Sequence, residues 1–178
     1  MRQIILYTAA SLDNYIARTD GDTKWLHSPE YMIDNEDYGY EDFYKTIDTT
    51  LMGNNTYKIL SGFGEPFPYS GKKNYVFSRV KTNQETENVK FISGDIVEFT
   101  KRLKTDKGKD IWLIGGGQIN ALFLNNDLID KVILTLFPII LGNGIHLFDG
   151  QTKESKLVLE SVRSYDNGLV QLTLKNKE

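Results

Sequence analysis

Short apolar runs recur along the chain at the length expected of β-strands. Each run spans about four to eight residues and is rich in Ile, Val, Leu, Phe and Tyr, the side chains that strands favour. These runs predict eight strands, at residues 3–9, 49–52, 74–77, 89–92, 111–114, 131–137, 156–162 and 169–174.

Helical patterns lie between several of these strands. In residues 96–103 the apolar side chains Ile96, Phe99 and Leu103 recur at a spacing of three and then four, which places them on one face of a helix. Similar patterns predict helices at residues 38–47, 56–60 and 118–125. Strands that alternate with helices favour an α/β sheet that is covered on both faces.

The last two strands differ from the others. The run at 111–114 is continuously apolar, as in buried parallel strands, whereas Val170, Leu172 and Leu174 alternate with polar residues. A turn at Asp166-Asn167-Gly168 joins this half-buried strand to the one before it. We therefore expect one domain over residues 1–178, a three-layer α/β/α sandwich. Its sheet is mixed, mostly parallel and eight-stranded, with a C-terminal antiparallel hairpin at the edge.

Composition excludes several classes of function. The chain has 21 Lys and Arg against 24 Asp and Glu, so its net charge of −3 lacks the basic character of a nucleic-acid-binding protein. It has no cysteine and only two histidines, which leaves no thiol chemistry and no expected metal site. Its apolar runs are too short for a membrane helix, and the start does not resemble a signal peptide, so we expect a cytoplasmic protein.

Three consecutive glycines carry the most chemical information. The predicted strand at 111–114 runs through Gly115, Gly116 and Gly117 directly into a helix. Glycines let a ligand approach the main chain, and the free N–H groups of a helix start attract a phosphate. A tight turn is the alternative, but one glycine would be enough for it. The dinucleotide fingerprint G-x-G-x-x-G does not fit, because Asn120 stands where it needs its third glycine.

Two further segments suggest phosphate binding. Gly53 and Thr56 follow the strand at 49–52, and the strand at 74–77 lies between a basic turn and Ser78-Arg79. If the sheet brings these ends together, one extended ligand with several phosphates spans them. The alternative for Lys72 and Lys73 of the basic turn is a solvated loop.

Taken together, these motifs resemble a known family. The chain resembles the dihydrofolate reductase superfamily over nearly its whole length. The motifs that carry this resemblance are Leu51-Met52-Gly53-x-x-Thr56-Tyr57, Gly71-Lys72-Lys73-Asn74 and Ile114-Gly115-Gly116-Gly117. Closer resemblance is to the reductase domain of the bifunctional riboflavin-biosynthesis deaminase/reductase and its stand-alone relatives. It rests on Ser11-Leu12-Asp13 with Ile16-Ala17, and on Pro138-Ile139-Ile140-Leu141-Gly142-Asn143-Gly144 with Leu147-Phe148.

The resemblance implies an NADPH-dependent reductase of a small heterocycle, similar to 5-amino-6-(5-phosphoribosylamino)uracil reductase. By position, it implies that the Gly115–Gly117 turn, with a cis Gly115–Gly116 peptide, holds the pyrophosphate together with Gln118. Gly53 and Thr56 would lie at a phosphate, and Ser78 and Arg79 at the adenosine 2′-phosphate, where a guanidinium suits a dianion. The resemblance also implies a homodimer, for which the apolar segments 131–137 and 138–148 are the expected surface.

Substrate contacts are expected near the first strand and the first helix. Asp13 is the candidate catalytic residue, as a carboxylate that binds the substrate or transfers a proton. Trp25, Asp37 and Tyr40 are the candidate substrate-binding residues, the two rings as stacking surfaces. The alternatives are a turn-forming Asp13 and core aromatic residues. Two other functions stay open: a dihydrofolate or pterin reductase, and a nucleotide-binding module without catalysis.

Departures from the family pattern bear on cofactor and substrate. Asn54 stands where dihydrofolate reductases commonly place a basic residue after the glycine. Asn14 and Tyr15 stand where the riboflavin enzyme usually continues Gly-Lys after the aspartate. The first change bears on the choice between NADPH and NADH, and the second on whether the substrate is phosphorylated.

Overall fold

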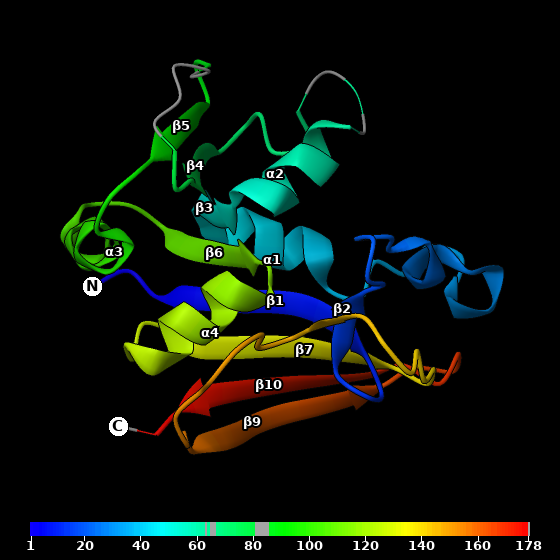
Figure 1. Ribbon diagram of the computed structural model, residues 1–178. Coiled ribbons are helices and arrows are strands. Elements are labelled where there is room, and N and C mark those ends of the chain that lie inside the picture. Colours follow the sequence, from blue (N-terminus) through cyan, green and yellow to red (C-terminus); the bar gives the residue numbers. More distant parts are fainter. Residues whose placement is uncertain (63, 65–66, 81–85, 178) are drawn as a thin grey trace.

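The fold is built on one eight-stranded sheet, seen in a computed structural model that describes residues 1–62, 64, 67–80 and 86–177 (Figure 1). In spatial order the strands are β5 (Val89–Ile92), β4 (Lys73–Phe77), β3 (Ile47–Gly53), β6 (Asp110–Gly115), β1 (Ile4–Ser11), β7 (Lys131–Phe137), β10 (Val170–Asn176) and β9 (Leu157–Ser164). The strands from β5 to β7 are parallel, and β10 is antiparallel to both β7 and β9. The predicted mixed sheet and its C-terminal edge hairpin are confirmed.

Helices cover both faces of this sheet. Successive residues of β1 point to opposite faces: Ile5 packs with Phe43 of α1 (Tyr40–Thr46), while Leu6 packs with Phe123 of α4 (Gly117–Asn125). The hydrophobic core cluster against which α2 (Asn54–Ser61) packs shares residues with the core cluster of α1. α3 (Ile96–Thr105) packs in the same core cluster as α4. The three-layer arrangement is therefore confirmed, with α1 and α2 on one face and α3 and α4 on the other.

Very short elements were not predicted. β2 (Tyr15–Ala17) pairs with β8 (Ile145–His146) in a separate two-stranded sheet. Two 3₁₀ helices, η1 (Lys24–His27) and η2 (Pro29–Tyr31), lie between β2 and α1. These elements have two to four residues, too few to show a hydrophobic period.

The connections diverge where β3 and β6 end. The chain leaves β3 through α2 on one face toward β4, and leaves β6 through α4 on the other face toward β7. In open α/β sheets, ligands bind at the carboxyl ends of the strands beside such a divergence. This topology selects the ends of β3 and β6 as the place to search for a site.

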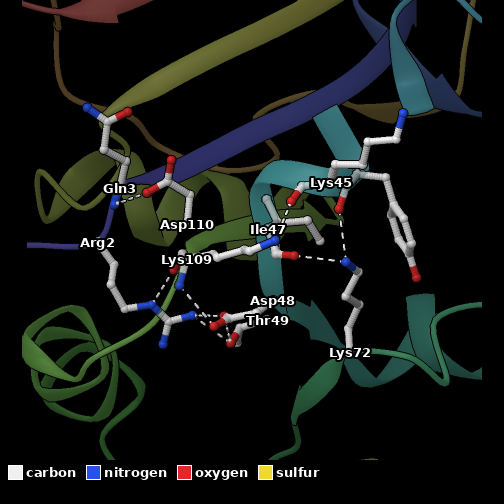
Figure 2. Close-up of polar contacts among 10 residues, drawn as sticks. Arg2, Gln3, Lys45, Ile47, Asp48, Thr49, Lys72, Lys109 and Asp110 are labelled. Atoms are coloured by element: carbon white, nitrogen blue, oxygen red, sulfur yellow. Dashed lines mark hydrogen bonds and ion pairs between the residues drawn. The ribbon is translucent and has the colours of Figure 1, made fainter. Parts of the chain in front are cut away.

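The basic turn before β4 lies at the amino ends of the parallel strands, opposite their carboxyl ends. Figure 2 shows Lys72, whose Nζ donates to the carbonyl oxygens of Tyr44 (2.9 Å) and Ile47 (2.8 Å) just at the end of α1. The same view shows buried Arg2 bonded to Asp48 and Thr49. Because Lys72 precedes a parallel strand, it lies at the amino edge and stabilises the end of α1. Neither of the two interpretations of this turn, a phosphate-binding edge or a solvated loop, describes Lys72, because its ammonium group is bonded within the fold.

Of the surface expected for a homodimer, residues 131–137 are largely buried, whereas Ile140 in residues 138–148 is 71% exposed. β7 is an interior strand between β1 and β10, and its Val132, Leu134 and Phe137 are buried. Its apolar character therefore reflects the core and gives no reason to expect an interface. The exposed apolar residues of the hairpin lie on β9 instead, where Leu159 is 55% exposed and Val162 is 56% exposed. In the described part of the chain, no helix has the length and apolarity needed to cross a bilayer.

Candidate functional site

Two helices begin at the carboxyl ends of adjacent strands, and both begin on a glycine. Gly53 is the N-cap of α2 and Gly116 is the N-cap of α4; within the described ranges, no side chain caps either helix. The other two α-helices differ, because Asp95 accepts from the N–H of Glu98 in α3 and Asp37 accepts from that of Glu41 in α1. The uncapped N–H groups of α2 and α4 carry partial positive charge.

A hydrogen bond joins the two helix starts. The N–H of Gly116 donates to the hydroxyl oxygen of Thr56 over 3.0 Å. The register of the sheet places the end of β3 next to Gly115. A β-carbon on Gly53 would lie only 3.2 Å from Ile119 of α4, so a glycine allows the two helices to approach. The starts of α2 and α4 therefore form one continuous site.

The three consecutive glycines serve different purposes. Gly115 has φ +101°, and a β-carbon there would lie 2.7 Å from the Asn120 side chain. A β-carbon on Gly117 would lie 2.2 Å from the carbonyl oxygen of His146. At Gly116 the nearest atoms would be at 3.5 Å on Thr56 and 3.7 Å on Ile16, which is ordinary contact. A β-carbon at Gly116 would thus be accommodated between Thr56 and Ile16. The Gly115–Gly116 peptide is cis, as the resemblance implied.

Ser78 and Arg79 lie at the carboxyl end of β4, on the same edge of the sheet. The Arg79 guanidinium donates to the Oε1 of Gln118, the second residue of α4, over 3.5 Å. The Ser78 hydroxyl donates to the carbonyl oxygen of Val80 and fixes the turn that carries the arginine. Gln118, expected at the pyrophosphate, and Arg79, expected at the 2′-phosphate, thus lie next to each other.

Asp13 follows β1 at this edge, but its carboxylate is already engaged. Its Oδ1 accepts from the Ser11 hydroxyl (2.6 Å) and from the N–H of Leu141 (3.1 Å), and its Oδ2 accepts from the N–H of Gly142 (2.8 Å). The bond from Ser11 is the largest cause of a lowered pKa, helped by the two backbone donors and opposed by partial burial. With its pKa lowered, this carboxylate is ionised at neutral pH and acts as a hydrogen-bond acceptor. The geometry favours the turn-forming alternative.

The three expected substrate-binding residues do not form one pocket wall. Trp25 is only 5% exposed and packs edge-on against Phe137, so it belongs to the core. Asp37 caps the start of α1 through the N–H groups of Gly39 and Glu41, and these bonds, chiefly that of Glu41, lower its pKa.

Tyr40 is half-buried in an aromatic cluster, where its ring lies against Tyr7, Tyr44 and Trp112. Burial raises its pKa to about 12, so its hydroxyl stays protonated at neutral pH. Of the three residues, Tyr40 alone combines partial exposure with a ring able to face a ligand.

Sequence reasoning missed Asn120. Its side chain is fully buried in the first turns of α4, and its Nδ2 donates to the carbonyl oxygen of Leu147 over 2.8 Å. A buried amide inside an apolar helix, three residues after the last glycine, is the signal that could have found it. Its carboxamide also lies against Gly115.

The chemistry of the site is that of anion binding beside an apolar wall. Two uncapped helix starts and an exposed guanidinium are groups that attract the phosphates of an extended ligand. Ile16 of β2 provides apolar surface next to Gly116.

Comparison with known proteins agrees with this geometry. The sequence model of the RibD C-terminal domain matches residues 70–171. The uncharacterized Bacillus subtilis protein YwjB is 41% identical over 164 residues, which cover 92% of each chain. A second uncharacterized protein of that organism, YyaP, is 32% identical over 185 residues, covering 96% of this chain and 93% of YyaP.

Solved structures share the whole fold. A Shewanella sp. PV-4 protein named for riboflavin biosynthesis is 31% identical, with a TM-score of 0.87 and 99% coverage of each chain. The Thermotoga maritima diaminohydroxyphosphoribosylaminopyrimidine deaminase/5-amino-6-(5-phosphoribosylamino)uracil reductase is 18% identical, with a TM-score of 0.73 over 99% of this chain and 57% of that one. Because the family model and YwjB each cover more than half of the sequence, this chain belongs to the RibD C-terminal domain family, with its dihydrofolate-reductase-like fold.

Proposed function

We propose that the chain is an NADPH-dependent reductase that acts on a small heterocyclic substrate. The observation that carries this proposal is the joined pair of uncapped helix starts, linked by the bond from Gly116 to Thr56. Membership of the RibD C-terminal domain family supports an oxidoreductase. The Thermotoga relative includes a uracil reductase, which supports the class of substrate.

Each part of the site has a role in this proposal. The N–H groups at the start of α4, at Gly117 and Gln118, bind the pyrophosphate, and Thr56 holds the turn in place. Arg79, steadied by Gln118, receives the 2′-phosphate that distinguishes NADPH from NADH. When bound, the cofactor supplies a hydride, so the chain has only to set two rings against each other and exclude water.

The substrate lies on the β1 side of the site in this proposal. The first turn after β1 carries Asn14 and Tyr15, which add no positive charge for a substrate phosphate. We therefore expect a pyrimidinedione or pterin ring, and the missing positive charge favours a substrate without a phosphate. Tyr40, half-buried in its aromatic cluster, is the proposed stacking partner.

A turnover screen tests the reaction. Purified protein is supplied with NADPH and, separately, with pyrimidinedione phosphoribosides, unphosphorylated pyrimidinediones, pterins and dihydrofolate, and oxidation of the cofactor is followed by absorbance. Turnover of a pyrimidinedione supports the proposal. Rapid turnover of dihydrofolate alone would instead assign a dihydrofolate reductase.

One observation favours a second candidate, a nucleotide-binding module without catalysis. The carboxylate of Asp13, the candidate catalytic residue, is engaged by three donors of the chain itself. Binding of NADPH without turnover of any compound in the screen would select the module.

A further inference from the structure

A long connection returns the chain from the end of β7 to the start of β9. This return segment, residues 138–156, runs in yellow and orange from the carboxyl edge of the sheet back to the amino edge (Figure 1). Its one regular element is the two-residue strand β8. Connections of this length without helices of their own are uncommon in compact folds and usually carry function. Contacts made by other parts of the chain must therefore hold it in place.

Asp13 holds the first part of the return segment. Its two carboxylate oxygens accept from the N–H groups of Leu141 and Gly142. The neighbouring N–H of Leu12 donates to the carbonyl oxygen of Ile139 over 2.8 Å. Charged acceptors form the stronger kind of hydrogen bond, so Asp13 is the main anchor at this end.

Asn120 holds the middle of the segment. Its Nδ2 donates to the carbonyl oxygen of Leu147, while the N–H of Leu147 donates to the carbonyl oxygen of Asn14 over 2.9 Å. The Oδ1 of Asn120 is buried against Gly115 and has no hydrogen-bond partner among the described residues. Its side chain therefore lies between the return segment and the glycine turn and contacts both.

The return segment also contacts the candidate site directly. The carbonyl oxygen of His146 lies only 2.2 Å from where a β-carbon of Gly117 would be. The N–H of Asp149 donates to the carbonyl oxygen of Gly117 over 3.1 Å. β8 pairs with β2, and β2 places Ile16 3.7 Å from where a β-carbon of Gly116 would lie. The position of the segment thus sets both the start of α4 and the wall opposite it.

From these contacts we propose that Asn120 and Asp13 are positioning residues for the dinucleotide. They hold the return segment against the start of α4, so that the space beside Gly116, between Ile16 and Thr56, keeps a fixed width. This inference rests on the proposed function. In this inference Asp13 acts by holding the return segment and does not transfer a proton. Asn120 is more than a buried core residue, because it holds the return segment next to the glycine turn.

The chain offers a matched control on the same helix. Asn125 also anchors the return segment, because its Nδ2 donates to the carbonyl oxygen of Gln151 and its Oδ1 accepts from the N–H of Lys153, each over 2.9 Å. These contacts lie at the last residue of α4, away from the glycine turn. Loss of Asn125 loosens the segment without moving Gly117 or Ile16.

Calorimetric titration with NADPH compares wild type with Asn120→Ala, Asp13→Ala and Asn125→Ala, alongside the thermal unfolding temperature of each. We expect the first two variants to bind about tenfold more weakly, which corresponds to about 1.4 kcal/mol. Asn125→Ala lowers the unfolding temperature but leaves the dissociation constant within about twofold of wild type. Asn120→Leu, which is close in size and uncharged but loses the donor, replaces Asn120→Ala if that chain does not fold.

Hydrogen exchange in the ligand-free protein gives a second readout. The N–H of Leu147 is expected to exchange faster in Asn120→Ala than in wild type, and unchanged in Asn125→Ala. Equal NADPH affinity in wild type and all variants would overturn this inference alone. Wild-type protein that does not bind NADPH would overturn the proposed function and this inference together.

Discussion

The hydroxyl of Thr56 and the N–H of Gly116 meet over 3.0 Å and join two helices that start on different strands. Thr56 lies in the first turn of α2, and Gly116 is the N-cap of α4. The two strands are neighbours, but the two helices lie on opposite faces of the sheet. This one bond therefore fixes the relative position of two groups of uncapped N–H donors.

Thr56→Val tests this bond. The variant keeps the shape of the side chain but leaves the N–H of Gly116 without its acceptor, which costs about 1 kcal/mol of unfolding free energy. We expect the NADPH dissociation constant to rise several-fold, because the two helix starts lose their link. Thr56→Ser keeps the hydroxyl and serves as the control. Denaturant unfolding and calorimetry measure both effects, and equal affinity in the Val and Ser variants would contradict the account.

Arg79→Ala tests the choice of cofactor. The guanidinium lies at the exposed end of β4, beside Gln118, where it can pair with a 2′-phosphate. We expect the affinity for NADPH to fall about tenfold or more, since charge-assisted bonds are strong, and the affinity for NADH to stay unchanged. Arg102→Ala, an exposed arginine on α3, is the control that removes the same charge elsewhere. An equal loss of affinity for both cofactors would show that Arg79 does not contact the 2′-phosphate.

The pKa of Asp13 predicts a pH dependence of stability. Hydrogen bonds, first from Ser11 and then from the backbone, lower this pKa in the folded chain. The group therefore stabilises the fold fully above its unfolded pKa, and this contribution is lost as the pH falls through the folded pKa. The difference in Tm between wild type and Asp13→Ala should be constant above about pH 5 and shrink in more acid solution. A difference that grows as the pH falls would mean that the pKa is raised.

Much of the fold follows from the sequence because each strand coincides with a short apolar run. Among the described residues, all eight strands of the main sheet and all four α-helices were expected from such runs and from helical patterns between them. The strand–glycine–helix order also predicts where Gly53, Thr56 and the glycine turn lie, at the carboxyl ends of adjacent strands, while their binding role stays a prediction.

The predictions that the structure does not bear out share one cause. Each depends on a contact between residues that are distant in the sequence. The pattern at Lys72 indicates a phosphate-binding edge or a solvated loop, whereas its ammonium group bonds to carbonyl oxygens at the end of α1. The predicted stacking surface of Trp25 packs against Phe137. Asn120 was missed because its partner, Leu147, lies 27 positions away. Local patterns carry no information on such pairs.

Homodimer formation stays a proposal, and the structure moves it to β9. Val162 and Leu159 pair with Leu172 and Leu174, so they lie on one face of the hairpin, and both are more than half exposed. An exposed apolar edge strand can pair with the same strand of a second copy of the chain. Val162→Lys should convert a dimer into a monomer by light scattering. Ser161→Lys, which points to the opposite face, should not, and a monomeric wild type would contradict the proposal.

Titration of NADPH into wild type and Gly116→Ala tests the central claim most directly. A β-carbon at Gly116 meets only ordinary contacts within the chain, so the variant should fold with a Tm close to that of wild type. The same β-carbon fills the space assigned to the pyrophosphate. We predict that wild type binds NADPH and that Gly116→Ala binds at least about tenfold more weakly, a loss of about 1.4 kcal/mol. Equal affinity in the two folded proteins would contradict a dinucleotide site at the starts of α2 and α4.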